Sequence, residues 1–186
     1  MNQSAESEVA TLAGGCFWCI EAVFLEVDGV RNVISGYTGG TTVNPTYEEV
    51  CINNTGHAEA VQVTFNPAKI SYREILEIFF SVHDLTTLNR QGADTGSQYR
   101  SAIFYHNEQQ KAIAEELVGE LNKARLREKP IVTQIAPLDA FYPAEEYHRE
   151  YFSRHREQSY CQMVIWPKVK KFRKQWPRRI KKWSTK

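Results

Sequence analysis

The residues best suited to chemistry are two cysteines in the segment Gly14-Gly15-Cys16-Phe17-Trp18-Cys19, which follows a short β-like run. Two glycines permit a sharp turn from a strand into a helix, and this turn would place Cys16 at the helix N-terminus. The free backbone N–H groups and the partial positive charge at such a terminus favour a thiolate over a thiol. We therefore expect the pKa of Cys16 to lie below that of a free cysteine and its sulfur to act as a nucleophile.

A nucleophilic sulfur also needs a group that can supply or accept a proton. Irregular stretches of the chain provide the candidates Glu59, Tyr47, Asp94 and Tyr99. From spacing alone, a glutamate at the start of a strand is usually a solvated surface residue. The alternative for Cys16 itself is a buried structural thiol, but the glycine turn before it argues against this.

The positions of these residues depend on an alternation of strand-like and helix-like segments. This pattern predicts a two-layer α/β sandwich with a ferredoxin-like βαβ core and long coil segments, folded as a single domain. We expect the two long loops to meet over the end of the sheet where the Cys16 helix begins. The predicted strands are 9–13, 30–37, 58–65, 101–105 and 131–135, the helices are 16–26, 71–82, 107–123 and 144–155, and the loops are 41–57 and 84–98.

The composition is that of a soluble globular protein, with 42% hydrophobic and 24% charged residues. The N-terminal segment is polar, and four cysteines are too few for a disulfide scaffold, so we expect reduced thiols and a cytoplasmic location. Residues 168–186 contain ten Lys or Arg and no acid, against 13 basic and 22 acidic residues in the rest. We divide the chain into a flexible segment 1–8, a catalytic domain 9–167 and a basic aromatic tail 168–186.

Further segments agree in order and spacing with one known family. They are Gly15-Cys16-Phe17-Trp18, Ser35-Gly36-Tyr37-Thr38-Gly39-Gly40, Asn44-Pro45-Thr46-Tyr47, Thr55-Gly56-His57-Ala58-Glu59-Ala60-Val61, Arg90-Gln91-Gly92-Ala93-Asp94 and Gln98-Tyr99-Arg100-Ser101. Together they resemble peptide methionine sulfoxide reductases of type A, and the likeness covers roughly residues 9–172. The resemblance implies reduction of protein-bound and free methionine S-sulfoxide.

The resemblance also implies a role for each matching residue. Cys16 would attack the sulfoxide sulfur and become a sulfenic acid, with Phe17 and Trp18 forming the pocket for the substrate's S-methyl group. A sulfoxide oxygen leaves only when protonated, so we predict that Glu59 is partly buried and acts as a general acid. Three further residues, Tyr47, Tyr99 and Asp94, would hold the oxygen or line the same site.

Resolution of the sulfenic acid has two candidate cysteines. Cys161 lies in a segment similar to the one that carries the recycling cysteine in many family members, where it is a mobile coil. Cys19 is the other candidate, because residues i and i+3 of a helix are close enough for a disulfide. We expect Cys161 to be the first resolver, with Cys19 or a relay of both as alternatives. The resemblance implies thioredoxin as the reductant, and no metal or organic cofactor.

Competing interpretations remain. The spacing of Cys16 and Cys19 also suits a thioredoxin-like oxidoreductase, although Phe17 and Trp18 are bulky for that motif. A zinc site with a histidine would lack a second cysteine pair. We expect His148 and His155, which are seven residues apart, to lie on the surface of a helix. A binding module could use residues 168–186, whose bases alternate with aromatic residues and could contact an anionic surface. We expect such a contact to be weak, and the protein to be a monomer.

Overall fold

The computed structural model describes residues 6–52, 54–124 and 129–182 of the 186-residue chain. The described part contains a six-stranded sheet in the order β7-β6-β1-β3-β2-β8. Neighbouring strands are antiparallel, except that β6 and β7 are parallel. The strands are β1 (Glu8–Gly14), β2 (Val30–Thr38), β3 (Ala58–Phe65), β6 (Ser101–Tyr105), β7 (Gln134–Pro137) and β8 (Phe141–Pro143).

A β-α-β-β-α-β unit forms the centre of this sheet. Helix α1 (Phe17–Phe24) connects β1 to β2, and α3 (Tyr72–Val82) connects β3 to β6. This succession is that of the ferredoxin-like fold. The predicted α/β class and ferredoxin-like core are therefore confirmed, and β7 and β8 extend the sheet at its two edges.

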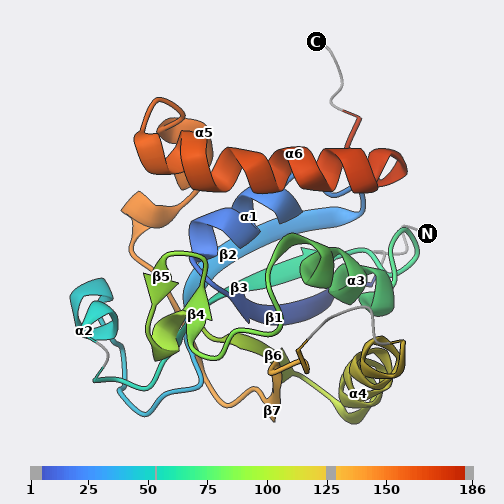
Figure 1. The fold of residues 1–186 in the computed structure, drawn as a ribbon, viewed down its shortest axis with the longest axis horizontal. Coiled ribbons are helices and arrows are strands. Elements are labelled where there is room, and N and C mark those ends of the chain that lie inside the picture. Colours follow the sequence, from blue (N-terminus) through green and yellow to red (C-terminus); the bar gives the residue numbers. More distant parts are fainter. Residues whose placement is uncertain (1–5, 53, 125–128, 183–186) are drawn as a thin grey trace.

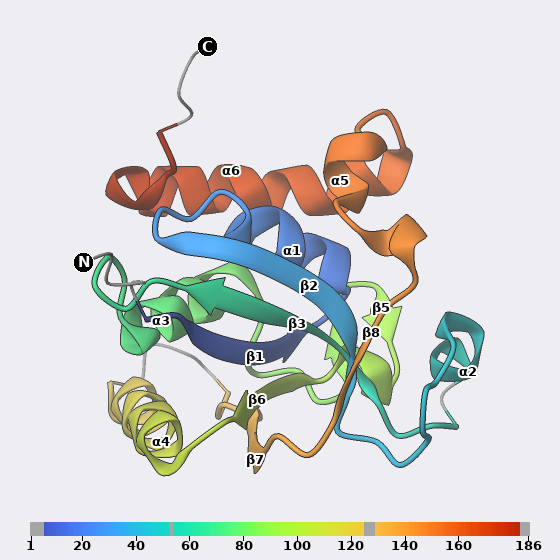
Figure 2. The same cartoon turned by 180° about the vertical axis from the view of Figure 1, so that it is seen from behind.

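The helices lie mainly on one face of the sheet. Figure 1 shows α1 and α3 in front of the strands, and Figure 2 shows the strands in front of these helices. Helix α6 (Trp166–Gln175) runs along α1 in both views. Val169 and Phe172 of α6 are fully buried in the core. The expected boundary between residues 167 and 168 therefore falls inside a packed helix, and the start of the basic tail belongs to the domain.

Local sequence signals explain where several helices begin. Ser71 forms a capping box with Glu74 at the start of α3, where the sequence predicted that a helix begins. Asn107 accepts the backbone N–H of Gln110 at the start of α4 (Glu108–Lys123). The predicted loop 41–57 contains a short helix, α2 (Tyr47–Cys51), whose own capping box begins at Thr46.

Two predicted elements differ from the structure. The strand expected at 131–135 begins at Gln134. The helix expected at 144–155 is broken into η2 (Glu146–His148) and α5 (Tyr151–Arg154). Glu150 lies between them with a φ of 49°, in the left-handed region that ends a regular helix.

The predicted loop 84–98 also contains short elements, and it meets the loop that carries α2. The Gln98 side chain donates a hydrogen bond to the Cys51 carbonyl at 3.4 Å, and the Gln91 side chain packs beside Gly15. The expected meeting of the two loops near the start of α1 is thus confirmed. The elements are β4 (Arg90–Gln91), β5 (Asp94–Thr95) and η1 (Ser97–Tyr99).

A π-helical turn, η3 (Cys161–Ile165), continues directly into α6. Pro167 gives a physical reason for this turn. Proline has no backbone N–H, and its ring collides with the carbonyl four residues earlier in a regular α-helix. A wider turn relieves that collision, and π turns of this kind occur often at functional sites. None of the helices in the described residues is long and apolar enough to cross a membrane.

Candidate active site

Cys16 lies where β1 ends and α1 begins. Gly15 has a φ of 87°, a backbone conformation that side-chain-bearing residues rarely adopt, and it turns the chain toward the helix. Cys16 is the N-cap residue of α1, and its side chain makes no capping hydrogen bond. It is 7% exposed. The strand, turn and helix predicted around this thiol are all present.

The thiol of Cys16 has three hydrogen-bonding neighbours: the Cys19 thiol, the Tyr160 hydroxyl and the Glu59 carboxyl. Burial, the hydrogen bond to Cys19 and the negative charge of Glu59 raise the pKa of Cys16 well above its ordinary value. The predicted lowering of this pKa is therefore wrong. The helix N-terminus does not compensate, because the Phe17 backbone N–H donates to Glu59 Oε2 at 3.0 Å and not to the sulfur.

Glu59 lies on β3, next to the start of α1, and is 2% exposed. Burial raises the pKa of this carboxyl to about 8. The hydrogen bond from the Phe17 N–H lowers the pKa, whereas the nearby Asp94 raises it further, and burial is the largest of these effects. Glu59 is thus mostly protonated at neutral pH, as a general acid must be. The predicted burial of this residue beside Cys16 is confirmed.

Phenol groups surround the same carboxyl. Tyr47 and Tyr99 are half-buried, and burial together with the charges of neighbouring groups, including Glu59, raises the pKa of both hydroxyls. Both therefore remain hydrogen-bond donors at any physiological pH. Asp94 enters the cluster through Tyr160, whose hydroxyl donates to Asp94 Oδ2 at 2.8 Å.

Aromatic side chains enclose the first turn of α1. The Trp18 ring stacks on Tyr151 with centroids 3.7 Å apart and planes within 5°, and Trp18 Nε1 donates to His148 Nδ1 at 3.0 Å. Phe17 is buried against Tyr37 and His148, with ring centroids 5.8 and 5.0 Å away. These rings form an apolar wall beside the sulfur.

Comparison with known proteins places this arrangement in a family. A family model described as peptide methionine sulfoxide reductase matches residues 8–180. The chain belongs to this family. It is an oxidoreductase that acts on peptide methionine sulfoxide.

Individual relatives match the sequence or the fold of this chain over most of its length. The peptide methionine sulfoxide reductase MsrA of Saccharolobus solfataricus is 58% identical over 174 residues, which cover 94% of this chain and 97% of the relative. Reduced Mxr1 from Saccharomyces cerevisiae has a TM-score of 0.76 at 33% identity, covering 87% of this chain and 92% of that one. Mxr1 in complex with Trx2 matches with a TM-score of 0.54 at 24% identity, covering 81% and 88%, which supports the fold.

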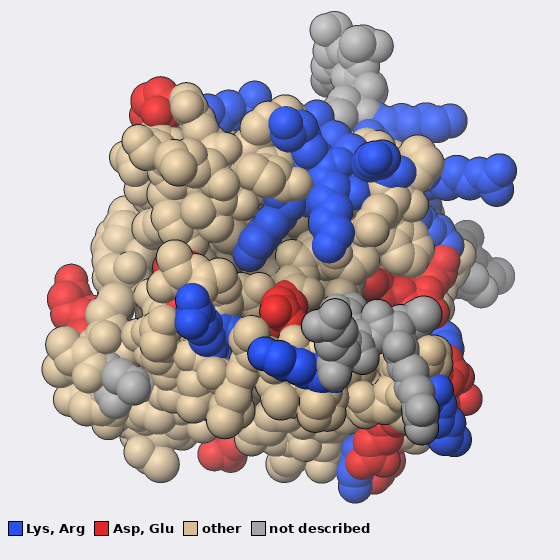
Figure 3. Space-filling view, viewed as in Figure 1, with Lys and Arg blue, Asp and Glu red and all other residues tan. Residues whose placement is uncertain are grey.

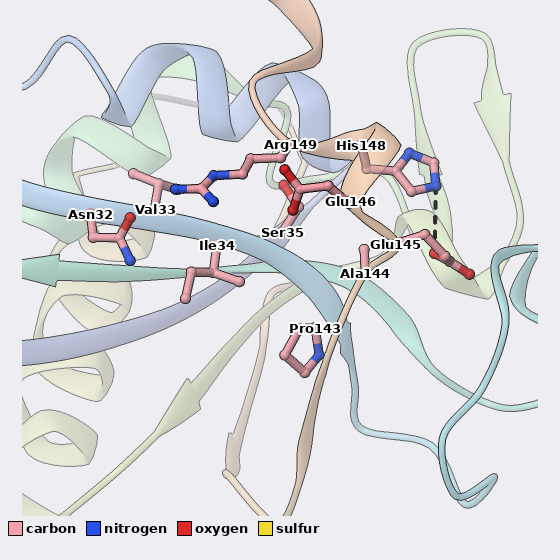
Figure 4. A pocket seen from close by; sticks show the side chains of 10 residues that line it. All are labelled: Asn32, Val33, Ile34, Ser35, Pro143, Ala144, Glu145, Glu146, His148 and Arg149. Carbon is pink, nitrogen blue, oxygen red and sulfur yellow. Dashed lines mark ion pairs between the residues drawn. The ribbon is translucent and has the colours of Figure 1, made fainter.

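The reductase also holds a polar cluster that sequence reasoning missed. Glu145 accepts hydrogen bonds from the Tyr37 hydroxyl and the Tyr47 backbone N–H, both at 2.8 Å. Partial burial would raise the pKa of Glu145, but these and other donors lower it below its usual range. His148 Nε2 lies 3.7 Å from Glu145 Oε2, and the dashed line in Figure 4 marks this pair. Glu145 thus fixes Tyr47 and supports the wall around Phe17.

His148 was expected on the surface of a helix, but it is 1% exposed. The signal that could have located it is the density of aromatic and acidic residues in Tyr142-Pro143-Ala144-Glu145-Glu146-Tyr147-His148. The side chains labelled in Figure 4, from β2 and residues 143–149, line a cavity. Its volume is about 280 Å³. Cys16 and Glu59 do not line that cavity, so it is separate from the thiol cluster.

Cys161 lies in the π turn and is 0% exposed. The family resemblance implied a mobile coil here, whereas the reductase has a helical segment packed on α1. Burial, followed by the charges of Glu157 and Cys19, raises the pKa of Cys161. Cys161 therefore lies within electrostatic range of Cys19. All four cysteines of the chain are free thiols.

Proposed function

We propose that the reductase acts on the S epimer of peptide-bound and free methionine sulfoxide through a sulfenic acid on Cys16. The observation that carries this proposal is the position of the buried Glu59 carboxyl at the start of α1, where it accepts the Phe17 backbone N–H at 3.0 Å beside Cys16. Burial raises the pKa of this carboxyl to about 8. A nucleophile and a protonated acid therefore face the same reacting group. The restriction to one epimer follows from enzymes of this chemistry, each of which handles one sulfoxide configuration.

In the first step the Cys16 sulfur attacks the sulfoxide sulfur while Glu59 gives its proton to the sulfoxide oxygen. The attack forms a bond between the Cys16 sulfur and the methionine sulfur, while the substrate's sulfur–oxygen bond breaks and the oxygen leaves as water with the Glu59 and thiol protons. Water then attacks the Cys16 sulfur, the sulfur–sulfur bond breaks and methionine is released, which leaves a sulfenic acid on Cys16 and returns one proton to Glu59. Methionine sulfur gains two electrons, and Cys16 loses two. Because Glu59 regains the proton that it gave, the sequence needs no external acid.

The phenols and the aromatic wall have separate roles in this step. Tyr47 and Tyr99, both hydroxyl donors near Glu59, hold the sulfoxide oxygen. Phe17 and Trp18 receive the S-methyl group, because the wall they form is apolar and adjacent to the sulfur. Asp94 fixes Tyr160, whose hydroxyl bonds the Cys16 thiol.

The contacts of the cysteines favour Cys19, and not the expected Cys161, as the first thiol to attack the Cys16 sulfenic acid. Cys19 is hydrogen-bonded to Cys16, whereas Cys161 is in range of Cys19. The hydrogen bond from Cys16 lowers the pKa of Cys19 and, with Lys168, outweighs burial. We infer that Cys19 attacks the sulfenic acid and releases water. The Cys161 thiolate then attacks the Cys19 sulfur, which forms a Cys19–Cys161 disulfide and releases Cys16 as a thiol.

Thioredoxin is the proposed reductant of the resulting Cys19–Cys161 disulfide. The yeast relative Mxr1 has been solved in complex with Trx2, and a disulfide needs an external dithiol to supply two electrons. The route uses no metal or organic cofactor.

We also propose a monomer in the cytoplasm, where four free thiols would stay reduced. Sedimentation analysis and cell fractionation test these two points. A stable dimer, or recovery from an oxidising compartment, would contradict them.

The mechanism is tested by one turnover without reductant, using each sulfoxide epimer, followed by thiol alkylation and peptide mapping. We expect the S epimer alone to be consumed, and a Cys19–Cys161 bridge to form. Cys161→Ser should trap a Cys16–Cys19 bridge, and Cys16→Ser should be inactive. Cys51→Ser is the matched control and should leave the bridge pattern intact.

A Cys16–Cys161 bridge in the wild-type protein would overturn the relay order. Normal thioredoxin-supported turnover in Cys19→Ser would do the same while leaving the sulfenic acid chemistry in place. Consumption of the R epimer alone would overturn the proposed specificity.

A further inference from the structure

Helix α6 and the residues after it expose a dense basic surface. Figure 3 shows Lys and Arg side chains gathered over α6, in the view of Figure 1. Between residues 168 and 182 the chain contains nine Lys or Arg and no Asp or Glu. We call the exposed residues Lys170, Lys171, Lys174 and Arg178 the basic face.

The basic face is not neutralised by its own domain. Neighbouring cations are paired: Arg173 with Glu26 at 2.7 Å, and Arg179 with Glu74. Within the described residues, by contrast, the four members of the basic face form no ion pair with a carboxylate. Their charges are therefore available to an external anionic partner.

The basic face adjoins a groove that contains Cys161. The groove has a volume of about 380 Å³ and is lined by Phe152, Arg156, Cys161, Gln162 and Trp166. Phe152 and Trp166 are nearly parallel, with ring centroids 6.2 Å apart.

Cations stand over both rings of this groove. Lys170 and Arg173 lie 5.7 and 5.2 Å from the Trp166 centroid, and Arg156 lies 5.7 Å from that of Phe152. The groove therefore has aromatic walls, a positive rim and a cysteine on its lining.

We propose that this groove and the basic face form the docking surface for an acidic, thioredoxin-type dithiol protein, which reduces the disulfide at Cys161. The proposal rests on the proposed function above, because it needs a disulfide that includes Cys161. A protein partner fits the combination of apolar walls, positive rim and redox residue. An anionic membrane fits less well, because Val169 and Phe172 of α6 are buried, and Trp166 lines the wall of a groove instead of projecting from a flat apolar face.

The exchange at this surface moves two electrons from the partner to the disulfide. Cys161 is 0% exposed in the reduced protein, so the groove must open over it before the partner can react. One thiolate of the partner then attacks the Cys161 sulfur, the Cys19–Cys161 bond breaks, and Cys19 leaves as a thiolate. The second partner thiol then attacks the mixed disulfide and releases Cys161. The partner ends as a disulfide, having supplied two electrons, and both cysteines of the reductase regain their protons.

The test compares reductants of different size and charge. Steady-state turnover of a methionine sulfoxide peptide is measured with an acidic thioredoxin and with dithiothreitol, for the wild-type protein and for Lys170→Glu/Lys171→Glu/Lys174→Glu. The matched control is Lys111→Glu/Lys123→Glu/Lys129→Glu, which makes the same charge change around and beyond α4.

We expect kcat/KM for thioredoxin to fall about tenfold in the α6 variant at low salt, and the difference to shrink at high salt. Turnover with dithiothreitol should stay within about twofold of wild type, because a small uncharged reductant gains nothing from the basic face. The α4 control should keep the wild-type kcat/KM for thioredoxin. Circular dichroism and thermal unfolding establish that both variants are folded.

An unchanged kcat/KM for thioredoxin in the α6 variant would overturn the proposal. So would an equal loss with dithiothreitol, which would assign the lysines to folding or chemistry. Loss of binding to RNA or anionic vesicles, with thioredoxin turnover intact, would identify another partner. Failure of the wild-type protein to turn over with dithiothreitol would instead contradict the proposed function itself.

Discussion

Two buried glutamates on different sides of α1 provide a natural comparison. Glu59 comes from β3 and is 2% exposed, and Glu21 belongs to α1 itself and is 1% exposed. Each accepts a backbone N–H, Glu59 from Phe17 at 3.0 Å and Glu21 from Glu150 at 3.1 Å. Burial raises the pKa of Glu59 to about 8 and that of Glu21 to about 7.

The two carboxyls differ in what they face. Glu59 contacts the Cys16 thiol, and its charge reaches the surrounding phenols. Glu21 accepts the backbone N–H groups of Glu150 and Tyr151, and Tyr151 is the residue that stacks on Trp18. Burial sets the protonation state in both regions, but neighbouring groups decide whether the acid transfers a proton or positions a wall of the pocket.

The largest effect should come from Glu59→Gln. Glutamine keeps an oxygen for the Phe17 N–H but has no acidic proton, so we expect the single-turnover rate to fall by about 10³-fold. Glu21→Gln is the matched control and should change that rate by no more than about threefold. Rapid-quench measurement of methionine formation checks both values. Equal losses in the two variants would remove the distinction between these acids.

The pH dependence of the same rate should follow Glu59. Its pKa of about 8 means that the acid form is lost as pH rises through that value, so the rate should be flat below it. Above it the rate should fall about tenfold per pH unit. Single-turnover rates between about pH 6 and 10 test this, because they do not depend on the reductant. A rate that rises through pH 8 would indicate that ionisation of Cys16 limits the reaction instead.

The pH dependence of the free energy of unfolding should contain contributions from both Glu59 and Glu21. Each folded-state pKa is raised from an ordinary value of 4.5 to about 8 for Glu59 and about 7 for Glu21. The stability they contribute is therefore complete below about pH 4.5 and is lost as pH rises through the folded values. We expect the free energy of unfolding to fall by a few kcal/mol over this range, and to fall less in Glu21→Gln/Glu59→Gln. Urea unfolding at several pH values measures the difference.

The smallest effect should be that of Glu21→Gln on substrate affinity. One amide oxygen replaces a carboxyl that serves two backbone donors, so Tyr151 should hold Trp18 less firmly. We expect KM for a sulfoxide peptide to rise about threefold with little change in kcat, which separates a positioning role from a chemical one. The tryptophan fluorescence spectrum should shift together with KM. In Glu21→Asp, both KM and the spectrum should lie between those of the wild type and Glu21→Gln. An unchanged KM and spectrum would give Glu21 a role in stability alone.

Much of the fold and part of the site could be predicted from local signals. The glycine turn before Cys16, the capping box at Ser71 and the cap at Asn107 each act over a few residues, so the sequence displays them directly. The burial of Glu59 followed from the chemistry required of it. The helix at Tyr47 was also readable from Thr46 and Glu49, but the surrounding turn residues obscured it.

The features that escaped prediction depend on contacts distant in sequence. The pKa of Cys16 is raised first by burial and then by Cys19 and Glu59, and Glu59 also accepts the helix N–H that the sulfur was expected to use. The burial of His148 depends on Trp18, 130 residues earlier. The helical position of Cys161 combines a local cause, Pro167, with packing of α6 on α1. Periodicity alone shows none of these relations.

The near-complete burial of Cys16 has a consequence for the lifetime of the enzyme under oxidative stress. We expect the sulfenic acid proposed on Cys16 to react with the neighbouring Cys19 thiol before it meets dissolved peroxide. Peroxide that did reach the sulfur would convert it to a sulfinic acid, which thiols do not reverse. The same enclosure that makes the nucleophile harder to ionise therefore guards it against irreversible damage.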